Sequence, residues 1–237
     1  LVADLSRKTR GVLDTRRSAV VGPHGALFAF CDGMGGAAAG EIASQLAVDI
    51  LYERMLDALP EGENIPRDEL ARRLVRAVEA AGLRIFQEAK LDRSRRGMGT
   101  TVTAATLVDD HLFLAQVGDS RGYILRGGQL IQVTRDQSLV NQLIEAGQLT
   151  EEEAETFEHN NIILQALGTS DTVQVDLTYA KLFRGDMLLL CSDGLSGMVR
   201  FEEIREVMRS EQDPADICKT LTDRANQAGG HDNISVI

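Results

Sequence analysis

The stretch FAFCDGMGG, Phe28 to Gly36, combines two features that are costly for a folded chain. An apolar run ends in the carboxylate of Asp32, although a buried strand gains nothing by closing on a charge. Three glycines then follow within four positions, and glycine loses more backbone entropy on folding than any other residue. We interpret the aspartate as a ligand, and the glycines as positions where backbone must approach the same spot.

Three further aspartates occur in a similar setting. Asp119 follows FLAQVG, Asp193 ends MLLLCS, and Asp232 lies in GGHDN just before the last apolar run. For any one of them a plain turn is the simpler interpretation, because Asp and Gly are common turn residues. Together, carboxylates at the rim of a sheet would repel one another and need a cation. Ligands that are all oxygen favour Mg²⁺ or Mn²⁺, which keep several waters.

The periodicity of apolar residues predicts helices in pairs and strands in runs. Long helices are predicted around 43–51 and 70–85, and short ones at 138–147 and 150–157. A last helix opens at Asp213-Pro214, and a capping box joins Thr150 to Glu153. The predicted strands are a hairpin of 18–22 with 26–30, an antiparallel meander over 101–133, two strands at 173–180 and 186–192, and a final one from Asn233. This order predicts the α+β class, a four-layer αββα sandwich with two antiparallel sheets stacked centrally and helices outside.

Composition excludes several classes of function. The 237 residues are 43% hydrophobic and carry a net charge of −11, which fits one large domain and a poor nucleic-acid binder. No apolar run reaches membrane-spanning length, and no signal-peptide core opens the chain, so we expect no membrane contact from this region. Three cysteines without metal spacing suit a reducing, cytoplasmic compartment. Because NISVI ends inside an apparent strand, we expect a catalytic region cut from a longer protein.

Two alternative nucleotide-binding motifs are rejected because the sequence around them does not match. GMGGAA, Gly33 to Ala38, matches a dinucleotide-binding fingerprint, but Glu53, at the spacing of the expected acid, lies in a helical run. No Gly-Lys-Ser/Thr follows, so a phosphate-binding P-loop fails too. Cys31 directly precedes Asp32, and Cys191 lies two residues before Asp193. Because side chains alternate along a strand, we expect both thiols to point into the sheet packing as core residues rather than to act as nucleophiles.

Six motifs occur in the order typical of one enzyme family. They are DGMGG at 32–36, MGTT at 98–101, VGDSR at 117–121, LGTSD near 168, LLLCSDGLSG at 188–197 and GGHDNISV at 229–236. Over nearly its whole length the chain resembles the metal-dependent protein serine/threonine phosphatases of the PPM, or type-2C, family, and is similar to its bacterial branch. The resemblance implies one catalytic domain over 1–237 and a flap-like segment at about 138–161 that screens substrates.

The resemblance also implies roles for individual residues. Asp32 resembles the carboxylate that bridges two metal ions, and Gly33 the residue that gives its carbonyl to one of them. Asp193 and Asp232 resemble further ligands of the first metal, and Asp119 a ligand of a third, weaker ion. Two Mn²⁺ or Mg²⁺ ions would then activate water to hydrolyse phosphoserine and phosphothreonine in proteins, in opposition to Ser/Thr kinases. No Ser or Cys nucleophile is needed.

The resemblance is poorest near the N-terminus. The family usually carries an arginine and, five residues on, Asn-Glu/Gln-Asp, whereas this chain reads TRGVLDTRR. Arg10 is the candidate phosphate-binding arginine, and Asp14 takes the place of the family's aspartate, within reach of the water shell of the metal at Asp32. Either this member is unusual or residues are absent between Arg10 and Asp14. A second departure is Asp136-Gln137-Ser138, where the family often has Asp-His-Ser.

The sequence leaves other functions open. One is a phosphatase-like domain with weak turnover that acts as a regulatory phosphoprotein-binding module, and another is a hydrolase of small phosphate esters. The clustered aspartates favour the enzyme, since their mutual repulsion has no use without metal. We expect a monomer that acts on phosphorylated proteins, the targets of a Ser/Thr kinase, but the sequence does not identify the substrate protein.

Overall fold

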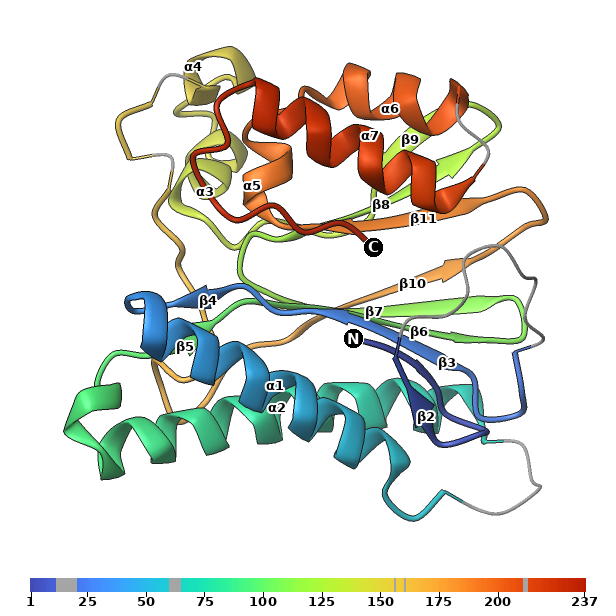
Figure 1. Ribbon diagram of the computed structural model, residues 1–237, viewed down its shortest axis with the longest axis vertical. Coiled ribbons are helices and arrows are strands. Elements are labelled where there is room, and N and C mark those ends of the chain that lie inside the picture. Colours follow the sequence, from blue (N-terminus) through green and yellow to red (C-terminus); the bar gives the residue numbers. More distant parts are fainter. Residues whose placement is uncertain (12–20, 60–64, 156, 160, 211–212) are drawn as a thin grey trace.

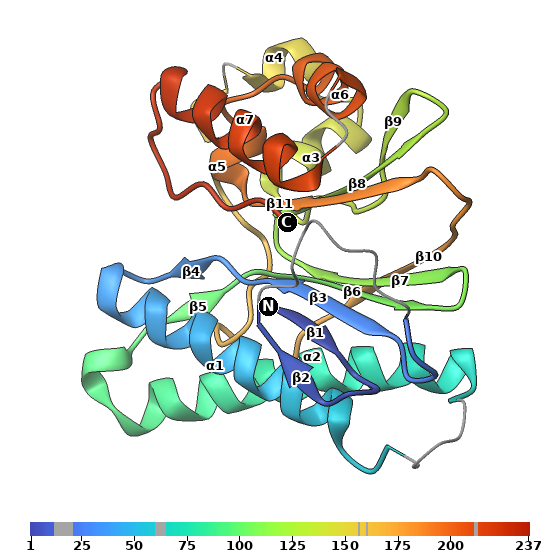
Figure 2. The same cartoon turned by 45° about the vertical axis from the view of Figure 1, so that its right-hand side comes forward.

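Two antiparallel sheets lie face to face at the centre of the molecule, and helices cover their outer faces (Figures 1 and 2). The computed structural model describes residues 1–11, 21–59, 65–155, 157–159, 161–210 and 213–237. The four layers, helix, sheet, sheet and helix, confirm the αββα sandwich predicted from the order of the elements. No helix in these described ranges is long and apolar enough to cross a membrane.

The larger sheet has six strands in the order β10-β7-β6-β3-β1-β2, and every neighbouring pair is antiparallel. All seven residues of β7 are buried, because this strand is covered on both faces. The strands are β1 Val2–Asp4, β2 Thr9–Arg10, β3 Ala26–Phe30, β6 Val102–Val108, β7 His111–Val117 and β10 Asp176–Lys181.

The second sheet has three strands in the order β11-β8-β9, with β8 Arg121–Arg126, β9 Gln129–Gln132 and β11 Met187–Cys191. A small ladder of β4 Gly33–Met34 and β5 Gly99–Thr100 extends from the end of β3. The opening glycine motif therefore lies where the chain leaves the larger sheet.

Helices of different length cover the two sheets. The long helices α1 Ala37–Leu56 and α2 Arg67–Leu91 cover the six-stranded sheet, and α6 Phe201–Ser210 and α7 Pro214–Gln227 cover the three-stranded one (Figure 1). Shorter elements are η1 Arg93–Arg95, α3 Leu139–Glu145, α4 Glu151–Glu155 and α5 Asp193–Ser196. The predicted caps are confirmed. Asp213 accepts the amide of Ala215 at the start of α7, and Thr150 and Glu153 accept each other's amides.

Apolar packing divides into three clusters that correspond to the three spaces between layers. One cluster joins α1 and α2 to the large sheet and includes Leu51, Leu74 and Ile85, each fully buried. A second joins α5, α6 and α7 to the small sheet. The third is small and lies between the sheets, around Leu114 and Leu190. The helices thus hold most of the core, and the contact between the sheets is left partly polar.

The structure corrects three predicted pairings. Residues 18–22 were the expected hairpin partner of β3; residues 18–20 lie outside the described residues, and β3 itself lies between β1 and β6, so both of its edges are occupied. The predicted meander divides after β7, because β7 and β8 belong to different sheets. From Asn233 onward the described residues form no strand: Val236 makes an isolated antiparallel bridge to Cys191, and Leu190 and Ile237 exchange backbone hydrogen bonds at 2.8 and 2.9 Å. Periodicity predicted where strands occur, but alternation of apolar residues does not specify which strands become neighbours.

Candidate active site

The four rim aspartates come from both sheets. Asp32 follows β3, and Asp119 lies where the chain crosses from β7 of one sheet to β8 of the other. Asp193 opens α5 directly after β11, and Asp232 precedes the segment that bridges to β11. The site can therefore form only where the two sheets meet.

Electrostatics show that these carboxylates are brought together. The pKa of Asp32 is raised to about 7, first by burial and then by Asp193, Asp232 and Asp119. Burial also raises the pKa of Asp119 to about 7, with the charges of Asp193 and Asp136 adding to it. The pKa of Asp193 is raised by burial and by the charge of Asp232. A group of negative charges this poorly hydrated is stabilised by protons or by a cation.

A divalent cation fits the donors present. Oδ1 of Asp193 is buried and has no hydrogen-bond partner in the described part of the chain. A buried carboxylate oxygen without a partner is costly, and a cation would satisfy it. Within the described ranges, no group of three or more His, Cys, Asp or Glu side chains could hold an ion by itself. Mg²⁺ and Mn²⁺ keep several waters and so need few direct protein ligands.

The glycines of the opening motif allow close backbone packing. A Cβ on Gly33 would lie 2.2 Å from the carbonyl oxygen of Gly40, in the first turns of α1. Gly35 and Gly36 have φ values of +103° and +89°, in the region that favours glycine. The chain can therefore turn sharply after Asp32 and lay α1 directly against β4, which explains why glycines follow the aspartate.

A similar close approach joins Asp193 to Asp232. A Cβ on Gly194 would lie 2.3 Å from the carbonyl oxygen of Asn233. Ser192 holds the same segment, since its hydroxyl donates to the Asn233 carbonyl at 3.0 Å and accepts the Ser235 amide at 3.1 Å. Sequence reasoning did not predict this serine as part of the site. Its position directly before a rim aspartate was the available signal.

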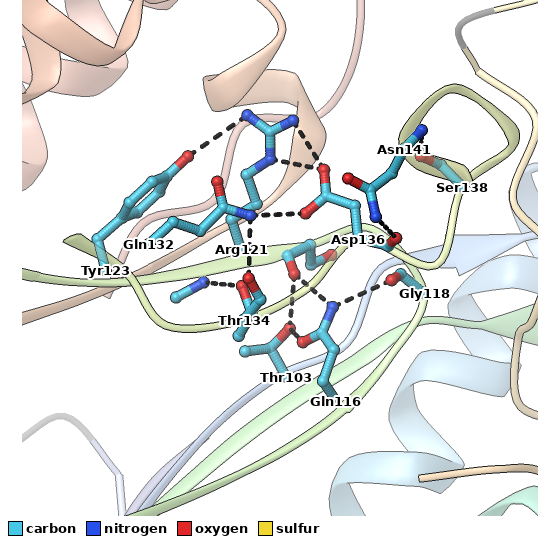
Figure 3. A network of polar contacts seen from close by, with 12 residues as sticks. Thr103, Gln116, Gly118, Arg121, Tyr123, Gln132, Thr134, Asp136, Ser138 and Asn141 are labelled. Carbon is cyan, nitrogen blue, oxygen red and sulfur yellow. Dashed lines mark hydrogen bonds and ion pairs between the residues drawn. The ribbon is translucent and has the colours of Figure 1, made fainter. Parts of the chain in front are cut away.

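A partly buried ion pair joins Arg121, two residues after Asp119 in the chain, to Asp136 (Figure 3). Arg121 contacts Oδ2 of Asp136 at 2.8 Å through Nε and at 2.7 Å through Nη2, and Gln132 donates to Oδ1 at 2.9 Å. These nearby charges, chiefly Asp136, raise the pKa of the guanidinium against the opposing effect of burial. Sequence analysis placed the two residues in separate motifs, VGDSR and Asp136-Gln137-Ser138, but did not predict that they pair, because the motifs are separated along the chain.

Gln137 connects the base of the flap-like segment to the crossover. Its side-chain oxygen accepts the Gly118 amide at 3.0 Å, and its own amide donates to the Gly118 carbonyl at 2.9 Å. Its side-chain nitrogen reaches Asp176 Oδ2 at 3.0 Å. At the other end of the segment, Leu164 donates to the Gln137 carbonyl at 2.8 Å. The glutamine that replaces the family's histidine is therefore a fully engaged structural residue.

Of the two N-terminal candidates, Arg10 and Asp14, only Arg10 lies within the described residues. Arg10 lies on β2, where it contacts Asp49 of α1 at 2.5 Å and stacks over the ring of Tyr52. Within the described part of the chain, Arg10 thus pairs with Asp49 and not with one of the four rim aspartates. Asp14 lies outside the described residues. The roles predicted for Arg10 and Asp14 stay predictions.

Both cysteines next to the site pack into the core. Cys191 is fully buried in the cluster under α5 to α7, and Cys31 is partly buried against the cluster under α1 and α2. Burial raises the pKa of each thiol to about 12. A thiol with so high a pKa is a poor nucleophile, since the thiolate is the reactive form. The interpretation of both as core residues agrees with this packing.

Comparison with known proteins agrees with this geometry. The sequence model of protein phosphatase 2C matches residues 14–234. The protein phosphatase PhpP of Streptococcus pneumoniae is 43% identical over 205 residues, which are 86% of this chain and 81% of PhpP. The serine/threonine protein phosphatase PstP of Mycobacterium tuberculosis is 38% identical over 232 residues, 98% of this chain but 43% of PstP.

Solved structures show the same fold. The crystal structure of the catalytic domain of PstP in complex with two manganese ions superposes with a TM-score of 0.77 at 40% identity, covering 90% of this chain and 86% of that one. Both chains thus share the sandwich as well as the sequence. The chain therefore belongs to the protein phosphatase 2C family and is a serine/threonine protein phosphatase of the bacterial type.

Proposed function

We propose that this phosphatase hydrolyses phosphoserine and phosphothreonine in proteins with two Mn²⁺ or Mg²⁺ ions held by Asp32, Gly33, Asp193 and Asp232. The observation that supports the proposal most is the pair of half-buried carboxylates of Asp32 and Asp193, whose pKa values are raised by burial and by neighbouring aspartates, with Oδ1 of Asp193 unpaired among the described residues. When bound, such ions supply an activated water and neutralise the phosphoryl oxygens. The manganese ions in the related PstP domain support the same assignment.

The placement of the chain's own residues would set up the ion-binding site for this reaction. Asp32 and Asp193 face each other closely enough to share a hydrogen bond when one is protonated, so one ion-binding point lies between the two sheets. Asp119 extends the negative field on the crossover side, and we assign it to a third, weaker ion. Ser192 and Gly194 keep the Asp232 segment against α5. All four carboxylates come from one chain, which supports a monomer as the working unit.

Substrate binding involves less well-supported residues. We assign the flap-like segment at about 138–161 to substrate screening, because its base is bonded to the crossover that carries Asp119. Arg10 as a phosphate ligand would first have to leave Asp49. Asp14 would contribute to the water shell of an ion at Asp32. The proposed partners are proteins phosphorylated by Ser/Thr kinases, and the free cysteines Cys31, Cys191 and Cys218 support a reducing, cytoplasmic location.

The test is metal-dependent hydrolysis of a phosphothreonine peptide. We expect EDTA to abolish phosphate release and Mn²⁺ or Mg²⁺ to restore it. The matched control is Asp223→Asn, an exposed aspartate on α7 paired with Lys219, which should behave as wild type. Full activity in chelator would overturn the metal assignment. Metal-dependent binding of the phosphopeptide without turnover would identify a binding module, and faster hydrolysis of nucleotides would identify a small-ester hydrolase.

A further inference from the structure

Two buried hydroxyl groups from different motifs meet beside the backbone of two rim aspartates, Asp32 and Asp119. Thr101 of MGTT precedes β6, and Ser120 of VGDSR lies on the crossover between the sheets. Their side-chain oxygens are 2.9 Å apart, and the two residues are 2% and 1% exposed. One of the two hydroxyls donates to the other, so no phosphate or water is needed to explain this contact.

Thr101 also holds the backbone of Asp32 on both sides. The Asp32 amide donates to Oγ1 of Thr101 at 3.1 Å, and the Thr101 amide donates to the Asp32 carbonyl at 2.8 Å. The hydroxyl of Thr100 donates to the same carbonyl at 2.8 Å. The peptide groups around Asp32 are thus fixed before any ligand binds.

Ser120 belongs to an equally well-fixed turn around Asp119. Its carbonyl accepts Oγ1 of Thr103 at 3.1 Å and Nε2 of Gln116 at 2.6 Å. Nε2 of Gln116 also reaches the Gly118 carbonyl at 3.1 Å, so both neighbours of Asp119 are held by one buried glutamine (Figure 3). The orientation of this turn therefore depends on the strands beneath it.

The turn packs directly onto Thr101. Gly118 has a φ of +104°, and a Cβ there would lie 2.6 Å from Cγ2 of Thr101 and 2.8 Å from its Cβ. Only glycine permits both this conformation and this approach. The packing of Gly118 on Thr101 and the hydroxyl contact between Ser120 and Thr101 are two separate interactions. Both hold the Asp119 turn against Thr101.

We propose that Thr101 and Ser120 are positioning residues whose hydroxyl contact sets the spacing between the carboxylates of Asp32 and Asp119. The proposal rests on the metal-binding function proposed above. Without an ion the carboxylates repel, and their turns would move apart unless something joined them. A buried hydrogen bond between the two turns opposes that movement and preorganises the donors, as outer groups around metal ligands commonly do.

The test measures Mn²⁺ affinity by titration calorimetry, independently of turnover, in the complete chain. Thr101→Val keeps the shape of the side chain and removes the hydroxyl, and Ser120→Ala removes the other partner while leaving the Asp32 contact. We expect each to weaken Mn²⁺ binding by about 10-fold, the lower end for groups that orient ligands. The double variant should bind Mn²⁺ no less tightly than the weaker-binding of the two single variants, because both remove the same contact. Thr101→Ser keeps the hydroxyl and should bind Mn²⁺ as tightly as wild type.

The control is Thr106→Val, at the other end of β6. Thr106 is fully buried and its hydroxyl donates to the Ala26 carbonyl at 3.2 Å, so the same change is made away from the carboxylates. We expect this variant to lose a similar amount of thermal stability with less than a twofold change in affinity. Equal weakening by Thr106→Val, or wild-type affinity in Thr101→Val and Ser120→Ala, would overturn the proposal.

Asp32→Asn separates this proposal from the proposed function. If Asp32→Asn binds Mn²⁺ as tightly as wild type, the metal site itself is wrongly assigned. If Asp32→Asn loses binding while both hydroxyl variants keep it, the metal site stands and only the positioning role fails.

Discussion

Two kinds of half-buried aspartate occur in this molecule. Asp136 is 9% exposed at its side chain and is neutralised by Arg121 and bonded by Gln132. Asp32 and Asp193 are also half-buried, but the charged groups that shift their pKa values, after burial itself, are other rim aspartates. The first kind has a counter-ion built into the chain, and the second does not. The difference separates a structural ion pair from a site that needs a cation from outside.

The largest expected effect is on phosphatase activity, which should depend on the rim aspartates. Asp32→Asn and Asp193→Asn should each lower turnover with Mn²⁺ by orders of magnitude, because each removes a proposed ligand. The melting temperature of the metal-free protein should hold or rise, since one of several repelling charges is gone. Phosphate release and thermal melting in EDTA measure both quantities. Near-normal turnover in either variant would remove that residue from the site.

The second prediction concerns stability rather than chemistry. Asp136→Asn leaves the guanidinium of Arg121 without its carboxylate and should lower the free energy of unfolding by about 1–3 kcal/mol. This lies below the usual cost of breaking a fully buried pair, because Arg121 is about a third exposed. Urea denaturation measures it, with Asp223→Asn on the surface as the control. A loss no larger than the control's would show that the pair contributes nothing.

The third prediction is a pH dependence of the metal-free protein. The pKa values of Asp32 and Asp119 are raised to about 7, far above the ordinary value of 3.8. Between about pH 4 and 7 the folded chain therefore binds more protons than the unfolded chain, so these groups lower its stability as the pH rises. In EDTA the melting temperature should fall from pH 5 to pH 7.5, and saturating Mn²⁺ should remove that decline.

A variant sharpens this pH test. Asp119→Asn removes one of the two titrating groups, so the decline in EDTA should become shallower. A melting temperature in EDTA that stays flat or rises over the same interval would contradict the raised pKa values.

The smallest expected effect concerns the neighbouring thiols. Cys31→Ala and Cys191→Ala should retain turnover, because both side chains pack into apolar clusters. Each should lose about 1 kcal/mol or less of stability, the effect of a small cavity. Denaturant melts and phosphate release measure the two quantities. Loss of catalysis in a folded variant would assign the thiol a chemical role.

The sequence predicts elements and local motifs better than it predicts neighbours. The helices around 43–51 and 70–85 follow from apolar spacing, and both exist as α1 and α2. The aspartates at strand ends were recognisable because each lies in a short motif of its own. The crossing of the chain from one sheet to the other at Gly118 was not recognisable from the sequence, because the patterns of β7 and β8 are those of consecutive strands in a meander.

Contacts between distant segments account for the other differences. The pairing of β1 with β3 and the Arg121–Asp136 pair each join residues with no shared pattern. Two helices, α5 and α6, were not predicted at all. For α5 the reason is length, because four residues are too few to show a helical period. The position of Arg10 beside Asp49 could not be read from a region where the resemblance was already poorest.

The clamp that Ser192 makes on the segment after Asp232 has a consequence for biosynthesis. Asp32 leaves the ribosome early, whereas Asp232 is synthesised after all the strands and helices named above. If Asp232 is a ligand as proposed, a growing chain holds only part of the proposed ligand set until the segment from Asn233 packs against β11. Contacts so distant in sequence also form late in folding. A nascent chain without this segment would thus be unable to dephosphorylate its surroundings, and the onset of activity would report that the two-sheet sandwich has formed.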